Sequence, residues 1–212
     1  NSFVSLDGTT LANDGNDTFN STQLIINSEI VGRGGNDVLG LLNAELQLSN
    51  STVNGNTGVD RIRLGASSGS YVYGGADTDT ITTTAGAANS SSSVMINGNK
   101  GSDFITLAAS GFATGTVYGG NGNDTINAAA ITDAAAVALG VTAAGVELFG
   151  DLGDDTITGS NGIDTINGGD GSDVINGGTG ADIINGGLGN DNITGGAGAD
   201  VIDAVGNDVL VY

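Results

Sequence analysis

An aspartate recurs every nine residues in the last third of the chain, each time inside the same glycine-rich frame. Residues 168–187 read GGDGSDVINGGTGADIINGG, two near-identical nonapeptides placed end to end. In each of them an aliphatic residue stands two positions after the aspartate. The interval is nine residues for the first six aspartates and eight for the last. These aspartates are Asp155, Asp164, Asp173, Asp182, Asp191, Asp200 and Asp208.

The same frame occurs upstream at wider intervals of 19 to 24 residues, with one interval of 31 before Asp155. Its aspartates are Asp17, Asp37, Asp60, Asp79, Asp103 and Asp124. An apolar residue again stands two positions after each of them, and from Asp37 onward another stands seven positions before. Self-similarity over nearly the whole chain predicts a solenoid, in which one small unit stacks on the next.

Each unit has the pattern of a short strand followed by a turn. In DVINGG the isoleucine is expected to point inward and its neighbours outward, and the glycines then reverse the chain. Turns that need positive φ or a close approach of two backbones select glycine. Such a strand is too short to be stable alone, so we expect stacked copies that form parallel sheets around a ladder of Ile and Val.

Composition excludes several classes of function. The 212 residues include 39 glycines and no Pro, Cys, His or Trp, and 24 acidic residues against four basic ones give a net charge of −20. This balance argues against binding to nucleic acid or to anionic membranes. No apolar run is long enough for membrane insertion. Without His or Cys, catalytic triads and zinc sites are impossible, so we expect no enzyme. The carboxylates are instead expected to be neutralised by bound cations.

The repeats GGDGSDVIN, GGTGADIIN, GGLGNDNIT and GGAGADVID resemble the calcium-binding nonapeptides of the RTX (repeats-in-toxin) family. The resemblance implies an all-β fold, a right-handed parallel β-roll or β-solenoid with two nonapeptides per coil. It also implies that Ca²⁺ ions lie between turns one coil apart on the same edge. Ca²⁺ takes six to eight oxygen ligands from carboxylates and backbone carbonyls, which fits these loops. The candidate metal-binding residues are the thirteen aspartates above and the turn glycines Gly169, Gly171, Gly178, Gly180, Gly187 and Gly189.

With a coil of about 18 residues, the nine-residue spacing fills both edges of the solenoid and the wider spacing fills one. We therefore expect three parts: residues 1–127 with one calcium turn per coil, an Ala-rich insert at 128–147, and residues 148–212 with calcium turns on both edges. Metal-free turns are expected at 65–70, 85–93 and 108–115. The insert could form a short helix over 131–139 or an irregular loop. One ion between successive loops gives an upper limit of about eleven ions.

Several loops depart from the consensus, and their sites are expected to be weaker or to lack an ion. Arg33, Asn56 and Asn99 replace the second glycine, Asp77 replaces the third, and Asn161 follows Gly-Ser in GSNGID. The first loop, ANDGND, lacks the leading glycines and is expected to be an incomplete end. The start of the chain shows neither an initiator Met nor a signal-peptide pattern, so an internal piece of a longer protein is expected.

The function expected from these features is that of a calcium-binding structural module of a secreted, cell-surface protein. S-layer proteins of RTX type are similar in being acidic, Cys-free and poor in lysine, with irregular coils. Such a module is expected to leave the cell unfolded by type I secretion, to fold on Ca²⁺ outside, and to contact copies of itself in a two-dimensional lattice or another cell-surface component. The alternatives are the extender of an RTX adhesin and the folding or secretion tail of an exported hydrolase.

Overall fold

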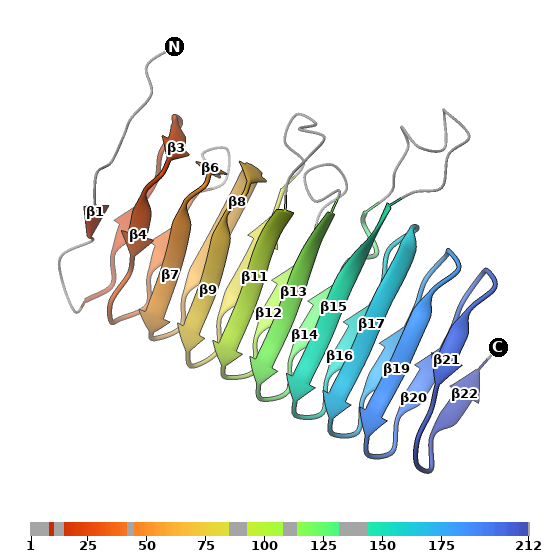
Figure 1. The fold of residues 1–212 in the computed structure, drawn as a ribbon. Coiled ribbons are helices and arrows are strands. Elements are labelled where there is room, and N and C mark those ends of the chain that lie inside the picture. The colour runs from red at the N-terminus through yellow and green to blue at the C-terminus, as the bar shows by residue number, and fades with distance from the viewer. Residues whose placement is uncertain are drawn as a thin grey trace.

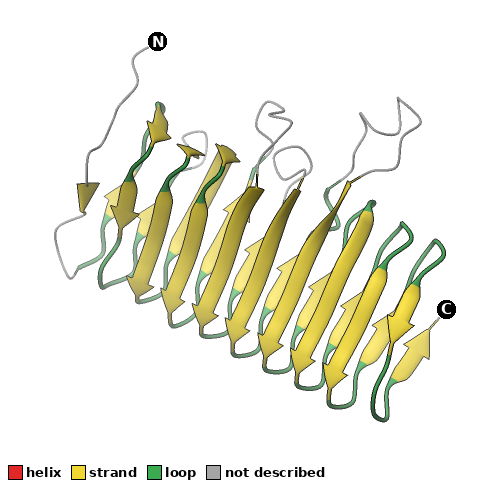
Figure 2. Cartoon of the chain, in the orientation of Figure 1, coloured by secondary structure: helices red, strands yellow, loops and turns green. Residues whose placement is uncertain are grey.

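The chain folds into a parallel β-solenoid, seen in a computed structural model that describes residues 9–10, 15–41, 45–84, 93–107, 114–131 and 144–211. Two parallel sheets face each other, and every coil contributes a strand to each (Figure 1). The described residues form strands, bridges, turns and loops, and they include no helix (Figure 2). The all-β fold class predicted from the repeats is confirmed.

Sheet 1 is defined as the strands that lead into the turns of Asp17, Asp37, Asp60 and the equivalent turns one coil apart. Its ten strands, in spatial order, are β1 (Thr9–Thr10), β4 (Glu29–Val31), β7 (Thr52–Thr57), β9 (Tyr71–Ala76), β11 (Ser93–Lys100), β13 (Thr114–Asn121), β15 (Ala144–Leu152), β17 (Ile163–Asp170), β19 (Ile183–Leu188) and β21 (Val201–Asp203).

Sheet 2 is defined as the strands that follow those turns. Ten of its twelve strands are β2 (Thr18–Phe19), β5 (Val38–Leu39), β8 (Arg61–Ser68), β10 (Thr80–Thr83), β12 (Phe104–Thr106), β14 (Thr125–Asn127), β16 (Thr156–Thr158), β18 (Val174–Asn176), β20 (Asn192–Thr194) and β22 (Val209–Val211). The other two, β3 (Leu24–Ile26) and β6 (Leu46–Ser49), pair beside the long strand β8.

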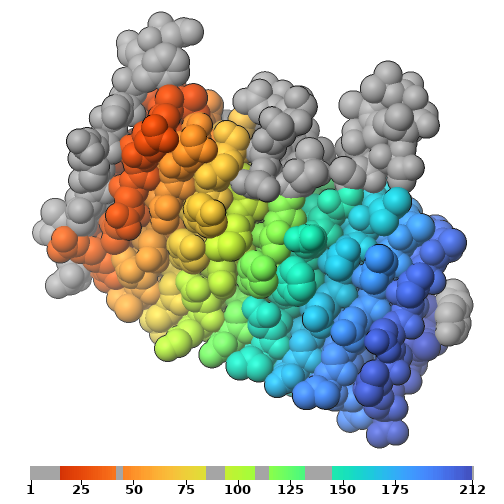
Figure 3. Space-filling model, viewed as in Figure 1, coloured from red at the N-terminus to blue at the C-terminus, as the bar shows by residue number. Residues whose placement is uncertain are grey.

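The chain advances from one end of the rod to the other as it passes between the two sheets. In Figure 1 the nearer strands of sheet 1 point down and the farther strands of sheet 2 point up, while the coils progress from the N-terminal to the C-terminal end. This is the sense of a right-handed coil. The space-filling view shows the coils as successive parallel rows of side chains (Figure 3).

The core is a ladder of aliphatic side chains between the two sheets. Ile81 of β10 is in register with Ile62 and Ile105 in the neighbouring coils, and all three are fully buried. Val72 of β9 faces them from sheet 1, where it pairs with Val53 and Ile96. These are the positions two after and seven before each aspartate, so the sequence pattern identified the core correctly.

Several sequence predictions fall on residues that the structure does not describe. They are the choice between helix and loop over most of the insert at 128–147, and most of the turns at 85–93 and 108–115. Within the described ranges, no helix is long and apolar enough to cross a membrane.

Candidate calcium-binding edges

One edge of the solenoid carries an unbroken ladder of aspartates. We call it the long edge; it joins sheet 1 to sheet 2 and lies at the bottom of Figure 1. The backbone N–H of each aspartate donates to Oδ1 of the aspartate in the next coil, at N–O distances of 2.7–2.9 Å. The ladder contains Asp17, Asp37, Asp60, Asp79, Asp103, Asp124, Asp155, Asp173, Asp191 and Asp208.

The second carboxylate oxygen of each of these residues has no such partner. In all ten aspartates Oδ2 is buried and accepts no hydrogen bond from the residues that the structure describes. A buried carboxylate oxygen without a donor costs several kcal/mol unless a cation or a proton neutralises it. The long edge therefore presents a row of ten buried oxygens that need a positive charge.

Burial also raises the pKa values of seven of these aspartates, which are Asp37, Asp60, Asp79, Asp103, Asp124, Asp155 and Asp173. Desolvation is the largest cause throughout, neighbouring carboxylates add to it in most of the row, and the N–H bonds of the ladder oppose it. From an ordinary value of 3.8, the pKa of Asp79 rises to about 8 and the pKa values of Asp124 and Asp155 rise to about 7. The pKa values of Asp60, Asp103, Asp173 and Asp182 rise to about 6.

A glycine five residues before the aspartate makes room for this oxygen in eight of the ten long-edge loops, from Asp37 to Asp191. A Cβ at Gly98 would clash with Oδ2 of Asp103 and with the carbonyl oxygen of Gly119 in the next coil. Gly55 has the same relation to Asp60 and Gly74. The carboxylate oxygen and a carbonyl oxygen of the next coil thus lie beside seven of these glycines, where a side chain would fill the space.

These glycines are not among the site residues predicted from the sequence, although their position in the repeat is invariant. The position five before the aspartate is glycine in all eleven loops from Asp37 to Asp200, with no substitution. The glycines are Gly32, Gly55, Gly74, Gly98, Gly119, Gly150, Gly159, Gly168, Gly177, Gly186 and Gly195. The positions four and two before the aspartate do vary, and those were the ones that had been singled out.

Those varied positions adopt left-handed backbone even where they are not glycine. Arg33, Asn56, Asp77, Asn99 and Asp151 have φ between 72° and 76°. The predicted turn glycines Gly169, Gly171, Gly178, Gly180, Gly187 and Gly189 have φ between 98° and 151°. Asn and Asp tolerate this region better than most residues. These five loops therefore keep the turn although they depart from the consensus, and the departure at Asp151 was not among those predicted from the sequence.

Among the described residues, the aspartate turns of the opposite edge lie in its C-terminal part. Asp164 donates its N–H to Oδ1 of Asp182 at 2.9 Å, and Asp182 donates to Oδ1 of Asp200 at 3.0 Å. We call these three residues the short row. The structure thus separates Asp155, Asp173, Asp191 and Asp208 from Asp164, Asp182 and Asp200, as alternation along an 18-residue coil requires. Within the short row, Oδ2 of Asp182 is buried and lacks a hydrogen-bond partner among the described residues.

Upstream, the opposite edge carries a serine ladder instead. The N–H of Ser28 donates to Oγ of Ser51 at 3.2 Å, and the N–H of Ser51 donates to Oγ of Ser70 at 3.1 Å. Each hydroxyl in turn donates to the carbonyl oxygen two residues earlier, at 2.8–2.9 Å. These three buried serines form a ladder without any charge, and their hydroxyls have protein hydrogen-bond partners.

The long edge fits a hard divalent cation. Its donors are carboxylate and carbonyl oxygens, the ligands that Ca²⁺ prefers. Among the described residues, no three acidic side chains converge on one point. A bound ion would therefore share one Asp Oδ2 with backbone carbonyls of the two adjoining turns. The residues that would hold such ions are the ladder aspartates and the turn residues between them.

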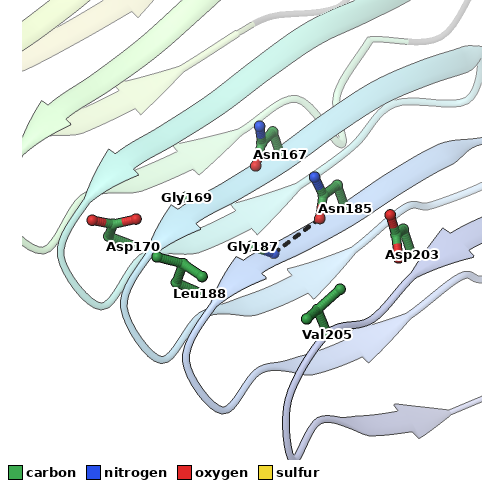
Figure 4. A pocket seen from close by; sticks show the side chains of 8 residues that line it. All are labelled: Asn167, Gly169, Asp170, Asn185, Gly187, Leu188, Asp203 and Val205. Atoms are coloured by element: carbon green, nitrogen blue, oxygen red, sulfur yellow. Dashed lines mark hydrogen bonds between the residues drawn. The ribbon is translucent and has the colours of Figure 1, made fainter.

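A shallow hollow lies on the outer face of sheet 1, away from these carboxylates. It is lined by Asn167, Gly169, Asp170, Asn185, Gly187, Leu188, Asp203 and Val205 (Figure 4). Asn185 folds back so that its Oδ1 accepts the N–H of Gly187 at 3.0 Å. None of the ladder aspartates lines this hollow, although two of the predicted metal-binding glycines, Gly169 and Gly187, do.

Comparison with known families identifies the motif behind these edges. A family model of the RTX calcium-binding nonapeptide repeat matches the chain in four copies, at residues 70–87, 116–130, 149–184 and 176–210. The chain carries RTX calcium-binding repeats. RTX repeats bind several Ca²⁺ ions, so the edge carboxylates within the matched stretches belong to a calcium-binding motif. No curated protein and no solved structure matches the chain.

The matched stretches leave out loops that the structure shows to be equivalent. Upstream, the RTX model matches the loops of Asp79 and Asp124, both of which begin with two glycines. It leaves unmatched the loops of Asp37, Asp60 and Asp103, in which Arg33, Asn56 and Asn99 hold the second position. All five loops share the same aspartate ladder, so the RTX architecture extends beyond the recognised repeats. That each of the thirteen aspartates binds an ion stays a prediction.

Proposed function

We propose that this chain is a calcium-dependent structural rod in a secreted, cell-surface protein, and that it folds when Ca²⁺ binds outside the cell. The observation that carries the proposal is the row of ten buried Oδ2 atoms without hydrogen-bond partners. No protein that must fold without cations gains from such a row, because each oxygen adds a desolvation cost. A cation at each interval of the long edge turns this cost into a stabilising interaction.

Ligand-linked stability supplies the mechanism. An ion that binds the folded chain and not the unfolded one stabilises it by about 2.7 kcal/mol at a free concentration a hundred times its dissociation constant. Extracellular RTX-like modules are expected to bind in the range of ~10⁻⁴–10⁻³ M. Because the sites repeat along the edge, their contributions add. Calcium at about millimolar levels outside the cell is then enough to fold the rod, whereas the cytosolic level is too low.

Export follows from the same linkage. With a net charge of −20 and 39 glycines, the calcium-free chain resists collapse. RTX repeats are typical of proteins that leave the cell by type I secretion, which passes an unfolded chain. The proposed order is therefore export first and folding second, with calcium outside the cell as the trigger.

Within this class we favour an S-layer-type role. The support is an acidic, lysine-poor chain built as a long rod with irregular coils upstream and regular coils downstream. Lattice assembly tests this part: electron microscopy of the parent protein after Ca²⁺ is restored is expected to show a two-dimensional lattice. Dispersed rods at the same calcium level would contradict the S-layer role and leave the calcium-dependent rod intact.

A calcium titration tests the proposed function itself. We expect the 212-residue chain to lack the far-UV circular dichroism of β structure in excess chelator at neutral pH and to gain it cooperatively with added Ca²⁺. Mg²⁺ at the same concentration serves as the control, since it requires nearly octahedral geometry and retains its waters. An unchanged β spectrum in excess chelator would contradict the proposal.

A further inference from the structure

The loop that opens the short row differs from every other aspartate loop in how its carboxylate is satisfied. In loop 159–164 the N–H of Ser160 donates to Oδ2 of Asp164 at 2.6 Å, and the hydroxyl of Ser160 donates to Oδ1 at 2.8 Å. Oδ1 also accepts the N–H of Val146, from the preceding coil, at 2.8 Å. Both oxygens of this buried carboxylate therefore have protein donors, and neither appears among the unpartnered buried atoms.

The next loop of the row shows the opposite arrangement. In loop 177–182, Oδ1 of Asp182 accepts the N–H of Asp164 at 2.9 Å, while Oδ2 is buried without a hydrogen-bond partner in the described part of the chain. A Cβ at Gly177 would clash with the carbonyl oxygen of Gly195, which lies in the following coil. Gly159 of loop 159–164 has the same close approach, to the carbonyl oxygen of Gly177, so the two loops share the space and differ in whether Oδ2 has a donor.

The backbone explains why the two loops differ. In loop 177–182 the residues four and two before the aspartate, Gly178 and Gly180, have φ of 100° and 143°. In loop 159–164 the equivalent residues, Ser160 and Gly162, do not adopt positive φ. The turn closes on itself instead, since the N–H of Gly162 donates to Oγ of Ser160 at 3.0 Å. As a result, an N–H and a hydroxyl occupy the donor positions that a cation would take.

Loop 159–164 lies next to the coil that contains the insert. The N–H of Asn161 donates to the carbonyl oxygen of Ile131 at 3.2 Å, so the loop is attached to the coil that contains the insert. That coil offers Val146, a backbone donor, where an aspartate turn would otherwise stand. Loop 159–164 is therefore the first aspartate turn that the structure describes on this edge.

We propose that loop 159–164 is a metal-free cap, in which Ser160 takes the place of the cation at Asp164, and that the short row holds one Ca²⁺, between loops 177–182 and 195–200. The inference rests on the proposed function, because it assumes that the unpartnered carboxylates bind Ca²⁺. It assigns Asp164 to positioning the turn and Asp182 to binding the ion.

Native mass spectrometry of the calcium-loaded 212-residue chain tests this assignment, since it resolves single ions on a protein of 20.6 kDa. Asp164→Asn is expected to keep the number of ions found in the unmodified chain, whereas Asp182→Asn is expected to bind one ion fewer. Loss of an ion from Asp164→Asn, with circular dichroism unchanged, would overturn the assignment. An unmodified chain that binds no calcium at all would instead refute the proposed function.

Ser160→Gly tests the cap by a gain of an ion rather than a loss, and it keeps every carboxylate. It restores the two leading glycines of the consensus and deletes the hydroxyl that donates to Asp164. We expect this variant to bind one ion more than the unmodified chain and to melt at a higher temperature in Ca²⁺. An unchanged ion count would show that Ser160 does not exclude the cation, and would overturn its proposed role even if Asp164→Asn behaves as expected.

Discussion

The coils before the insert and those after it are stabilised in different proportions by apolar burial and by their turns. The coil that begins at Ile30 also buries Leu39, Leu46 and Leu48, whereas the coil that begins at Ile166 adds only Ile175 as a large apolar side chain. Two further buried leucines contribute roughly 3–6 kcal/mol. At millimolar Ca²⁺ and the dissociation constants of ~10⁻⁴–10⁻³ M expected outside the cell, one ion contributes about 0.4–1.4 kcal/mol. Several ions together are therefore needed to offset two buried leucines, and a coil with a smaller core depends more on its calcium turns.

The turns of the opposite edge differ in the same way between the two regions. Upstream, Ser28, Ser51 and Ser70 pass hydrogen bonds from coil to coil and leave no unpaired hydroxyl. Downstream, an aspartate makes the same N–H contact through Oδ1 but adds a second oxygen that needs a cation. A neutral ladder suits a coil with a larger core, and a charged ladder suits a coil that depends on calcium.

The largest effect is expected from pH on the calcium-free chain, because it acts on several coils of the long edge at once. Folding raises the pKa values of the ladder aspartates from 3.8 to between about 6 and about 8 in the central coils. Between about pH 4 and pH 8 the folded state therefore binds more protons than the unfolded state, and its stability increases as pH falls. We expect β circular dichroism to increase on acidification from pH 8 to about pH 5 after the metal has been removed with a chelating resin.

Protons and calcium compete for the same oxygens, which gives this prediction a second readout. The apparent affinity for Ca²⁺ is expected to fall as pH falls through the raised pKa values. A calcium affinity that increases on acidification, or a calcium-free chain equally unfolded at both pH values, would argue against neutralisation of the ladder as the source of stability.

The next effect is expected from adding a methyl group beside one carboxylate. Gly98→Ala places a Cβ against Oδ2 of Asp103 and the backbone of Gly119, neither of which can move without shifting the coil. We expect the loss of one ion and a lower melting temperature in Ca²⁺. Gly65→Ala is the matched control on the opposite edge, where the added Cβ would meet its nearest atoms at 3.4–3.8 Å and φ is not positive. Equal effects of the two substitutions would remove the distinction between the edges.

Asp103→Asn removes the negative charge of the same loop and keeps the shape of the side chain. The amide oxygen can still accept the N–H of Asp79, so the coil-to-coil hydrogen bond is kept. The variant is expected to lose one ion and about 2.7 kcal/mol of stability at a calcium concentration a hundred times the dissociation constant. In chelator it is expected to be no less stable than the unmodified chain, because a buried charge has been removed. Greater instability in chelator would contradict this account.

The smallest effect is expected from Ser51→Ala in the serine ladder. It removes a hydroxyl that accepts from Ser28 and donates to Ser49, at a cost of about 1 kcal/mol. The ion count is expected to stay unchanged, which equilibrium dialysis with calcium analysis measures directly. A lost ion in this variant would mean that the upstream coils bind metal on both edges.

The repeat spacing predicted the stacked coils and the two edges because side-chain periodicity follows directly from the coil. Ile62, Ile81 and Ile105 had to face inward once their aspartates were aligned. Loop chemistry was harder to predict, because it depends on φ and on groups in neighbouring coils. Arg33 keeps the left-handed turn despite its side chain, and Ser160 abandons it, although both occupy the same position in the repeat.

The anomalous scattering of calcium in crystals grown with Ca²⁺ tests the difference between the edges most directly. The account predicts one peak at each interval between successive aspartates from Asp17 to Asp208, and one further peak between loops 177–182 and 195–200. No peak is expected beside Ser28, Ser51 or Ser70. Calcium bound along the serine ladder, or a long edge without calcium, would contradict the account.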